Sequence, residues 1–108
     1  MMREIKESDW KIFKELLGIA QERFCQRALS DIVGIIETTT NTSYERFCEI
    51  YDLLRDRNKE LVESLSELRR STAIYQLLAM KRLELVTEKE FARFSEETQN
   101  RINALLEL

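Results

Sequence analysis

The chain has 108 residues, enough for one domain with a modest core. Its 44% apolar and 34% charged residues exclude a disordered composition, and two glycines with no proline exclude a turn-rich β protein. The net charge of −3 comes from 17 basic and 20 acidic residues without a basic block, which excludes the usual pattern of nucleic-acid binding. We therefore expect one all-α domain over residues 1–108 and no nucleic-acid partner.

The compartment is predicted from what the sequence lacks. The opening residues, MMREIKESDW, contain no apolar run, so we expect no signal peptide. The longest apolar stretch runs from Ala73 to Met80 and is far too short to span a membrane. We therefore expect a cytoplasmic protein with no membrane partner, whose Cys25 and Cys48 thiols stay reduced.

A first helix is predicted over residues 9–37. Ser8 is a suitable N-cap, and Asp9 follows it in the first turn, where an acid interacts favourably with the helix dipole. Apolar residues recur in steps of three and four, which predicts one buried stripe that Leu29 and Val33 widen on one side. The stripe consists of Phe13, Leu16, Leu17, Ala20, Phe24, Ala28, Ile32, Ile35 and Ile36.

A short polar loop, residues 38–43, follows, so the helices on either side are expected to be antiparallel neighbours. Thr42 and Glu45 have the T-x-x-E spacing of a capping box. A second helix is predicted over residues 43–85 because coiled-coil seam positions recur in alternating steps of four and three. They are Phe47, Tyr51, Leu54, Asn58, Leu61, Leu65, Leu68, Thr72, Tyr75 and Ala79. The polar Asn58 is expected to fix the register of this seam, with a solvated bend as the alternative.

The second predicted helix outruns the first, and its overhanging end is apolar on all sides. A helix of that kind has to be buried, so we expect a second subunit to cover it and a homodimer to form. The expected interface residues are Leu54, Asn58, Leu61, Leu65, Leu68, Ile74, Tyr75 and Leu78. We expect Leu65→Asp to dissociate this dimer. The alternative is a break near Arg70 and Ser71 that folds the chain back into a compact monomer.

Two short helices are predicted at the C-terminal end, over residues 88–94 and 96–107. Thr87 and Glu90 repeat the capping-box spacing, and Ser95 is an N-cap followed by acids. We expect both helices to fold back onto the long second helix. The predicted fold is thus a long antiparallel helical hairpin, bundle-like, with two short C-terminal helices.

The tetrapeptide ERFC occurs twice, at residues 22–25 and 45–48, and contains both cysteines. The residues that follow the two copies share no identity, which argues against a duplication. An antiparallel hairpin offsets the cysteines by roughly 10 Å along the helix axes, more than a disulfide spans. We interpret both copies as helix segments whose phenylalanine faces the core, with cysteine packed beside it as a small apolar residue.

No pattern in the sequence indicates catalysis or a cofactor. Histidine is absent, which removes the commonest general base and metal ligand, and there is no glycine-rich phosphate loop. Four acids near the starts of the C-terminal helices are better explained as caps than as an acid–base pair: Glu88, Glu90, Glu96 and Glu97. We therefore expect no enzyme, no catalytic or metal-binding residues and no cofactor.

Three stretches of the chain together resemble a set of small, uncharacterised bacterial all-helical proteins. They are SDWKIFKELLGIAQERFCQRAL, SYERFCEIYDLLRDRNKEL and RRSTAIYQLLAMKRLELVTEKEFARFS. The shared features are a Trp-containing first helix, a long second helix and a T-x-x-E…F-S tail. The resemblance implies a bacterial, cytosolic setting and carries over no catalytic residue.

Together these patterns predict a non-catalytic protein–protein interaction or scaffold module that self-associates through its second helix or binds an unidentified protein partner. The alternative is a regulatory protein that binds a small ligand or an acidic partner in the bundle interior, in a deep pocket lined by Arg and Tyr. Candidates for a patch facing an acidic partner are Arg69, Arg70, Lys81 and Arg82. A carboxylate-based enzyme is the least favoured prediction.

Overall fold

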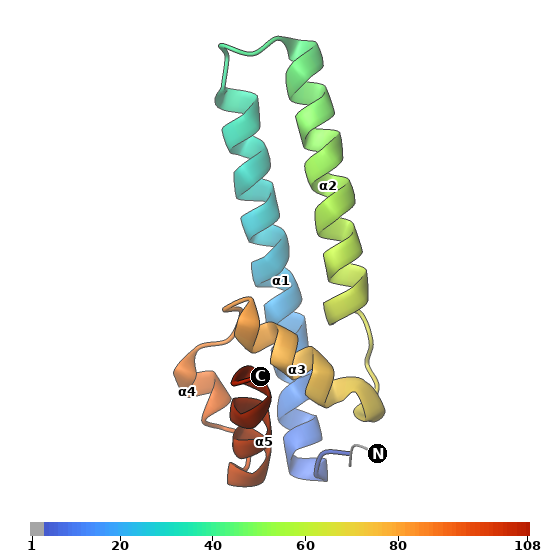
Figure 1. Cartoon of the computed structure of the whole chain (residues 1–108), viewed down its shortest axis with the longest axis vertical. Coiled ribbons are helices and arrows are strands. Elements are labelled where there is room, and N and C mark those ends of the chain that lie inside the picture. Colours follow the sequence, from blue (N-terminus) through green and yellow to red (C-terminus); the bar gives the residue numbers. More distant parts are fainter. Residues whose placement is uncertain (1–3) are drawn as a thin grey trace.

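The computed structural model describes residues 4–108, which form helices and no strand (Figure 1). The elements are α1 (Glu7–Glu37), α2 (Ser43–Leu65), the 3₁₀ turn η1 (Arg70–Thr72), α3 (Ala73–Arg82), α4 (Glu88–Phe91) and α5 (Glu96–Leu106). The molecule is elongated, 52 × 27 × 26 Å, because the α1–α2 hairpin projects from a base made by the remaining helices. The predicted all-α class, the antiparallel hairpin and the two short C-terminal helices are confirmed. Of the predicted domain, residues 1–3 lie outside the described part.

Helix α1 begins at Glu7, with Lys6 as an N-cap that provides no side-chain hydrogen bond. The prediction of Ser8 as N-cap is therefore wrong by two residues. The buried stripe is confirmed for the first two-thirds of the helix, where Phe13, Leu16 and Ala20 are completely buried. Trp10 stacks on Phe13, with ring centroids 5.7 Å apart, and so closes the lower end of the core.

The turn between α1 and α2 is fixed by hydrogen bonds that the sequence pattern predicted. The Thr42 hydroxyl accepts from the Glu45 backbone N–H at 3.1 Å, and the Glu45 carboxylate accepts from the Thr42 N–H at 3.0 Å. The capping box is therefore confirmed, and it satisfies two backbone donors at the start of α2. Arg46 also donates to the Ile36 carbonyl at 2.7 Å, which ties α2 to the end of α1.

The predicted second helix over residues 43–85 is wrong, because α2 ends at Leu65. A helix end leaves carbonyls without intrahelical partners, and here a distant side chain supplies one: Gln21 donates to the Leu65 carbonyl at 2.6 Å. The Ser66 hydroxyl donates back to the Val62 carbonyl at 2.5 Å. These bonds stabilise the end of α2 without glycine or proline, the residues that usually mark a helix stop.

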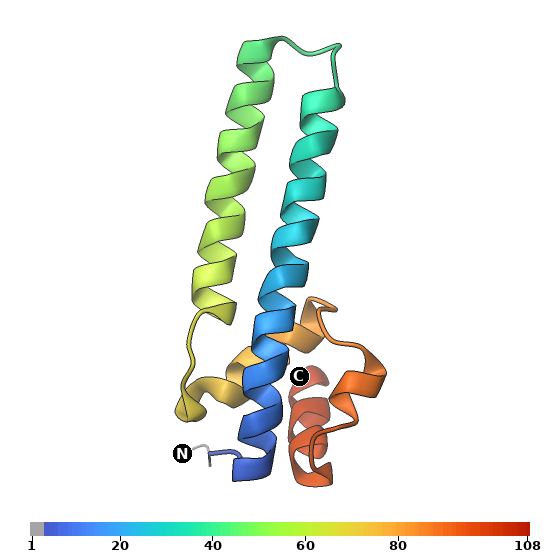
Figure 2. The ribbon, with the colours of Figure 1, turned by 180° about the vertical axis from the view of Figure 1, so that it is seen from behind.

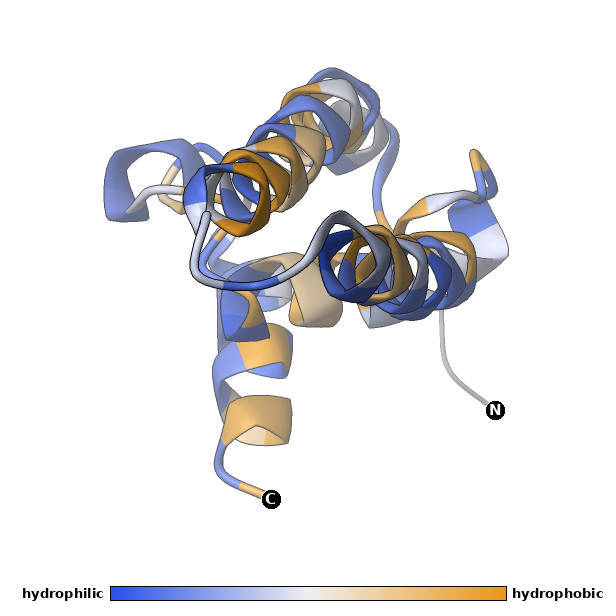
Figure 3. Cartoon of the chain, turned by 90° about the horizontal axis from the view of Figure 1, so that it is seen from above, coloured by the Kyte–Doolittle hydropathy of each residue, from blue (hydrophilic) through white to orange (hydrophobic). Residues whose placement is uncertain are grey.

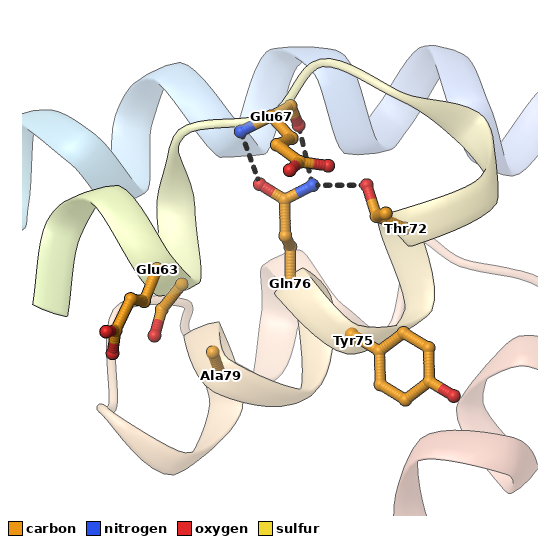
Figure 4. A pocket seen from close by; sticks show the side chains of 7 residues that line it. Glu63, Glu67, Thr72, Tyr75, Gln76 and Ala79 are labelled. Carbon is orange, nitrogen blue, oxygen red and sulfur yellow. Dashed lines mark hydrogen bonds between the residues drawn. The ribbon is translucent and has the colours of Figure 1, made fainter.

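The chain reverses between α2 and α3 around the side chain of Gln76 (Figure 4). Its amide oxygen accepts from the Glu67 N–H at 3.0 Å, and its amide nitrogen donates to the Glu67 carbonyl at 2.6 Å and to the Thr72 hydroxyl at 3.1 Å. Gln76 is only 5% exposed, and its three hydrogen bonds are partly buried, so competition from water is reduced. The residue that looked like a polar interruption of an apolar segment holds the reversal in place.

The apolar segment that was predicted to overhang becomes the core of the same chain. Helix α3 crosses α1 at the base (Figures 1 and 2), and its buried residues include Ala73, Ile74, Leu77, Leu78 and Met80. They pack with Phe13, Leu16 and Leu17 of α1 and with Phe91, Phe94 and Ile102 of the C-terminal segment. The argument that this segment must be buried was right, but a second subunit is not what covers it. Of the two alternatives from the sequence, the break and fold-back is the one the structure contains, although the helix ends at Leu65 and not near Arg70 and Ser71.

The C-terminal helices begin as predicted. Thr87 and Glu90 form a second capping box, and the Ser95 hydroxyl accepts from the Thr98 N–H at 3.3 Å. Helix α4 is shorter than predicted and ends at Phe91, while α5 ends one residue early at Leu106. Both helices lie against α1 and α3 rather than along a long second helix.

Candidate functional site

The hairpin above the base is covered by no other element of the described chain, and it exposes large apolar side chains on both arms. On α1 these are Leu29, Val33 and Ile36, each 50–60% exposed. On α2, Phe47 is 72% exposed and Tyr51 is 61% exposed. Figure 3, which looks down on the hairpin tip, shows apolar residues recurring along both arms. Exposed apolar surface of this extent marks association sites in soluble proteins.

A groove runs between the two arms and shows which side chains share a face. It has a volume of about 310 Å³. From α1 it is lined by Phe24, Cys25, Ala28 and Leu29, and from α2 by Leu54, Arg57, Asn58 and Leu61. Leu29 and Leu54 therefore lie on the same side of the hairpin.

The exposed residues nearer the tip continue this face. Val33 and Ile36 follow Leu29 at i+4 and i+7, and Tyr51 and Phe47 precede Leu54 at i−3 and i−7, spacings that keep one side of a helix. We call these six residues, Leu29, Val33, Ile36, Phe47, Tyr51 and Leu54, the open face.

The open face is on the side of the hairpin away from the base. Val33 lies nine residues beyond the buried Phe24, which is about 180° around α1 at 3.6 residues per turn. The base packs against the Phe24 side, and Figure 2 accordingly shows α1 running in front of α3. Because nothing in residues 4–108 crosses the open face, another molecule has access to it along its whole length.

The eight predicted interface residues separate into three groups. Leu54, Asn58 and Leu61 meet in the groove. Leu68 and Tyr75 are exposed at 61% and 57% but belong to the linker and to α3. For Leu65, Ile74 and Leu78 the prediction is wrong, since they are 0%, 2% and 8% exposed and form the core of the single chain. The heptad seam is thus continuous along one helix only on α2, before its buried end at Leu65.

The sequence reasoning missed the contribution of α1 to this surface. Leu29, Val33 and Ile36 were assigned to one buried stripe, but the base covers that stripe only as far as Ala28. The interpretation that both ERFC phenylalanines face the core is confirmed for Phe24, which is 7% exposed, and is wrong for Phe47, which is 72% exposed. Cys25 is exposed and Cys48 partly buried, and both thiols are free. One signal in the sequence could have indicated this surface. Both arms of the hairpin carry more apolar residues than two helices can bury between them.

The base is held together by a buried carboxylate at the start of α1. Asp9 is 1% exposed and accepts hydrogen bonds from the Ser95 N–H at 2.8 Å, the Ser95 hydroxyl at 2.6 Å and the Thr98 hydroxyl at 2.7 Å. Burial raises the pKa of this carboxyl, but the hydrogen bonds from Ser95 and Thr98, with the charge of Lys6, outweigh it and leave the pKa below its ordinary value. Asp9 therefore binds the N-terminus of α5 to α1, and it lies in the first turn of α1 as predicted.

A second polar connection joins α1 to α4. Arg23 donates to both oxygens of Glu90 at 2.6 and 3.0 Å and to the Leu85 carbonyl at 2.9 Å. The hydrogen bonds from Arg23 and then from the Thr87 N–H lower the pKa of Glu90 to about 2. Arg27 completes the set by donating to the Leu83 and Glu84 carbonyls at the end of α3. The acids near the C-terminal helix starts are engaged in the same way: Glu88 pairs with Lys81 and Glu97 with Lys6.

We expect the stability of the protein to fall as the pH drops from about 4.5 to about 2. A carboxyl whose pKa is lower in the folded state than in the unfolded state stabilises the fold when ionised, and this stabilisation is lost on protonation. Glu90 should account for about 1 kcal/mol of this loss by pH 3, after the full pKa shift is discounted for its partial exposure. Urea unfolding at pH 7, 4 and 3 measures it, with Glu90→Gln as the comparison. A free-energy difference between parent and variant that does not narrow toward pH 3 would contradict this role of Glu90.

Of the four basic residues predicted to face an acidic partner, Arg70, Lys81 and Arg82 make internal contacts, while Arg69 is exposed. Arg70 donates to the Ile5 carbonyl at 2.8 Å and pairs with Glu7, and Lys81 lies 4.3 Å from the Phe91 ring centroid. Tyr75 and Arg82 line a groove of about 390 Å³ between α2 and α3, which is the nearest feature to the predicted Arg- and Tyr-lined pocket.

Within residues 4–108, no three Cys, Asp or Glu side chains gather in the way a metal ion requires. Nor does the described part contain a helix long and apolar enough to cross a membrane.

Comparisons with protein-family models, with curated proteins and with solved structures find no match to this chain. The resemblance to small bacterial helical proteins therefore stays a prediction.

Proposed function

We propose that this protein is a non-catalytic interaction module that self-associates through the open face of its hairpin. The observation that carries the proposal is the apolar surface shared by α1 and α2 on the side away from the base. A hairpin of two helices has no interior of its own, and apolar surface on one side of it is removed from water when another hairpin packs there, as in four-helix bundles.

The area of the open face supports a stable pairing. Its six residues are between 48% and 72% exposed. Phe47 and Tyr51 are aromatic side chains of roughly 150–250 Å² and the four aliphatic ones are somewhat smaller, so together they present on the order of 600 Å² per copy. A standard interface buries about 800 Å² per partner, and the groove residues with the polar rims on either side supply the difference. Aromatic residues are the commonest affinity anchors, which favours Phe47 and Tyr51 in that role.

The test of this proposal is the molar mass in solution. We expect light scattering on a sizing column to give twice 12.9 kDa at micromolar concentrations. Leu54→Asp places a charge in the open face and should raise the dissociation constant at least about 30-fold while the fold persists, because Leu54 is 48% exposed within the chain.

The matched control is Tyr75→Asp, since Tyr75 is as exposed as the residues of the open face but belongs to α3. This variant should remain a dimer. A parent protein that stays monomeric over the whole dilution series, or a Tyr75→Asp variant that dissociates as readily as Leu54→Asp, would contradict self-association through the open face.

A further inference from the structure

Resting on the proposed self-association, we infer that two copies pair about a two-fold axis parallel to the hairpin. Both tips then point the same way, and α1 of each copy packs against α2 of the other. The alternative two-fold axis, perpendicular to the hairpin, places α1 against α1 and α2 against α2 with the tips at opposite ends. Both arrangements join the open faces, so other features of the surface must distinguish them.

The first argument for the parallel arrangement comes from the height of each residue, meaning its position along the long axis of the hairpin. Gln21 reaches the Leu65 carbonyl and Arg46 reaches the Ile36 carbonyl, so residues 21 and 65 are at similar heights, as are 36 and 46. In the parallel arrangement each height of α1 meets the same height of the partner's α2. The large residues near the tip of one copy, Leu29 to Ile36, then face Phe47 to Leu54 of the other, and apolar surface covers apolar surface throughout.

The second step concerns the small residues lower on α1. Gly18 and Cys25 lie on the same side of the helix as Leu29, at spacings of eleven and four residues. Both are exposed, and a Cβ on Gly18 would meet no atom within 4 Å. In the parallel arrangement this low surface meets the lower part of α2, where Leu61 is half-buried and Val62 is 55% exposed. In the perpendicular arrangement Gly18 faces the tip of the partner's hairpin or the solvent beyond it, where no close approach of a second helix requires a residue without a side chain.

The third step is charge. Glu22 on α1 and Lys59 on α2 are both exposed, and neither has an ion-pair partner within the described residues. Glu22 is at the height of the α2 turn that follows Lys59. Asn58 lines the groove and Lys59 is next to it, so across a parallel two-fold axis the carboxylate of one copy comes closest to the Asn58 amide of the other and is nearer to its ammonium than the perpendicular axis allows, twice per dimer. The perpendicular axis separates Glu22 from Lys59 and moves it toward the partner's tip.

The arrangement is tested by a distance between two copies. Lys11, exposed near the start of α1, is replaced by cysteine in a Cys25→Ser, Cys48→Ser background, and a spin label is attached. Lys11 is about 20 residues from the middle of the open face. The parallel arrangement therefore predicts a label separation below about 30 Å, and the perpendicular arrangement one above about 50 Å, at 1.5 Å per residue.

A double-mutant cycle supplies an independent measurement. Glu22→Lys and Lys59→Glu should each raise the dimer dissociation constant about fivefold, and the double variant should restore it. A dimer with a long label distance, or with additive effects of the two charge reversals, overturns the parallel arrangement but leaves self-association intact. A monomeric parent protein overturns the proposed function itself, so the two failures are distinguishable.

Discussion

Leu65→Asp should unfold the protein rather than dissociate a dimer. Leu65 is completely buried at the junction of α2 with the base, where its carbonyl accepts the hydrogen bond from Gln21. A carboxylate at this position has no cationic partner among the core residues, so we expect a loss of more than about 4 kcal/mol. That is a large share of the about 5–15 kcal/mol that stabilises a typical domain.

The comparison within α2 makes this prediction specific. Leu54→Asp introduces the same charge eleven residues earlier, on the open face, and should leave the helical circular dichroism unchanged. Urea unfolding followed by circular dichroism measures both variants. A Leu65→Asp variant that is helical, stable and monomeric would mean that Leu65 belongs to an interface, as the uninterrupted second helix required.

The local features of the fold were predictable because their signals lie within a few residues of each other. Thr42 with Glu45 and Thr87 with Glu90 form their capping boxes from neighbouring atoms, and Ser95 caps the helix that follows it. The steps of three and four along α1 likewise describe one helix whatever surrounds it. Such patterns are sufficient for an all-α hairpin with helical additions at the C-terminal end.

The break after Leu65 was not predictable from local pattern, because heptad spacing continues through it to Ala79. Two contacts beyond the reach of a helical pattern stabilise it: Gln21 of α1 bonds to the end of α2, and Gln76 bonds to the backbone of Glu67, nine residues earlier. Neither glutamine is distinguished by its spacing in the sequence from the other polar residues. Because α3 packs against α1, a single chain buries the apolar segment that had been expected to need a second subunit.

The candidate site was predicted in part for the same reason. Leu54, Asn58 and Leu61 were identified from the α2 seam and do meet in the groove. The residues of α1 that complete the open face were assigned to a buried stripe. A sequence shows that a helix has an apolar side but not how far a neighbouring helix extends along it. Here the base ends near Ala28, and that boundary makes Leu29, Val33 and Ile36 surface residues.

The buried Asp9 was another residue whose role depended on distant partners, and its replacement provides the second large expected effect. Asp9→Ala removes the acceptor for three hydrogen bonds from Ser95 and Thr98. Donors left unsatisfied in a buried site cost about 1–3 kcal/mol each when water cannot reach them, and the cavity left by Asp9 admits some water. We therefore expect a loss on the order of 3 kcal/mol and a drop in Tm of about 10 °C or more.

Two comparisons show whether the loss comes from these hydrogen bonds. Asp9→Asn keeps one acceptor oxygen but points an amide donor at other donors, so its stability should lie between those of the parent and Asp9→Ala. Ser8→Ala changes the adjacent exposed residue, which does not cap α1, and should alter the free energy of unfolding by less than about 0.5 kcal/mol. Equal losses for Asp9→Ala and Ser8→Ala would mean that the start of α1 matters only for its own helix. A loss confined to Asp9 means that this carboxylate joins the two ends of the chain, which keeps the base closed beneath the hairpin.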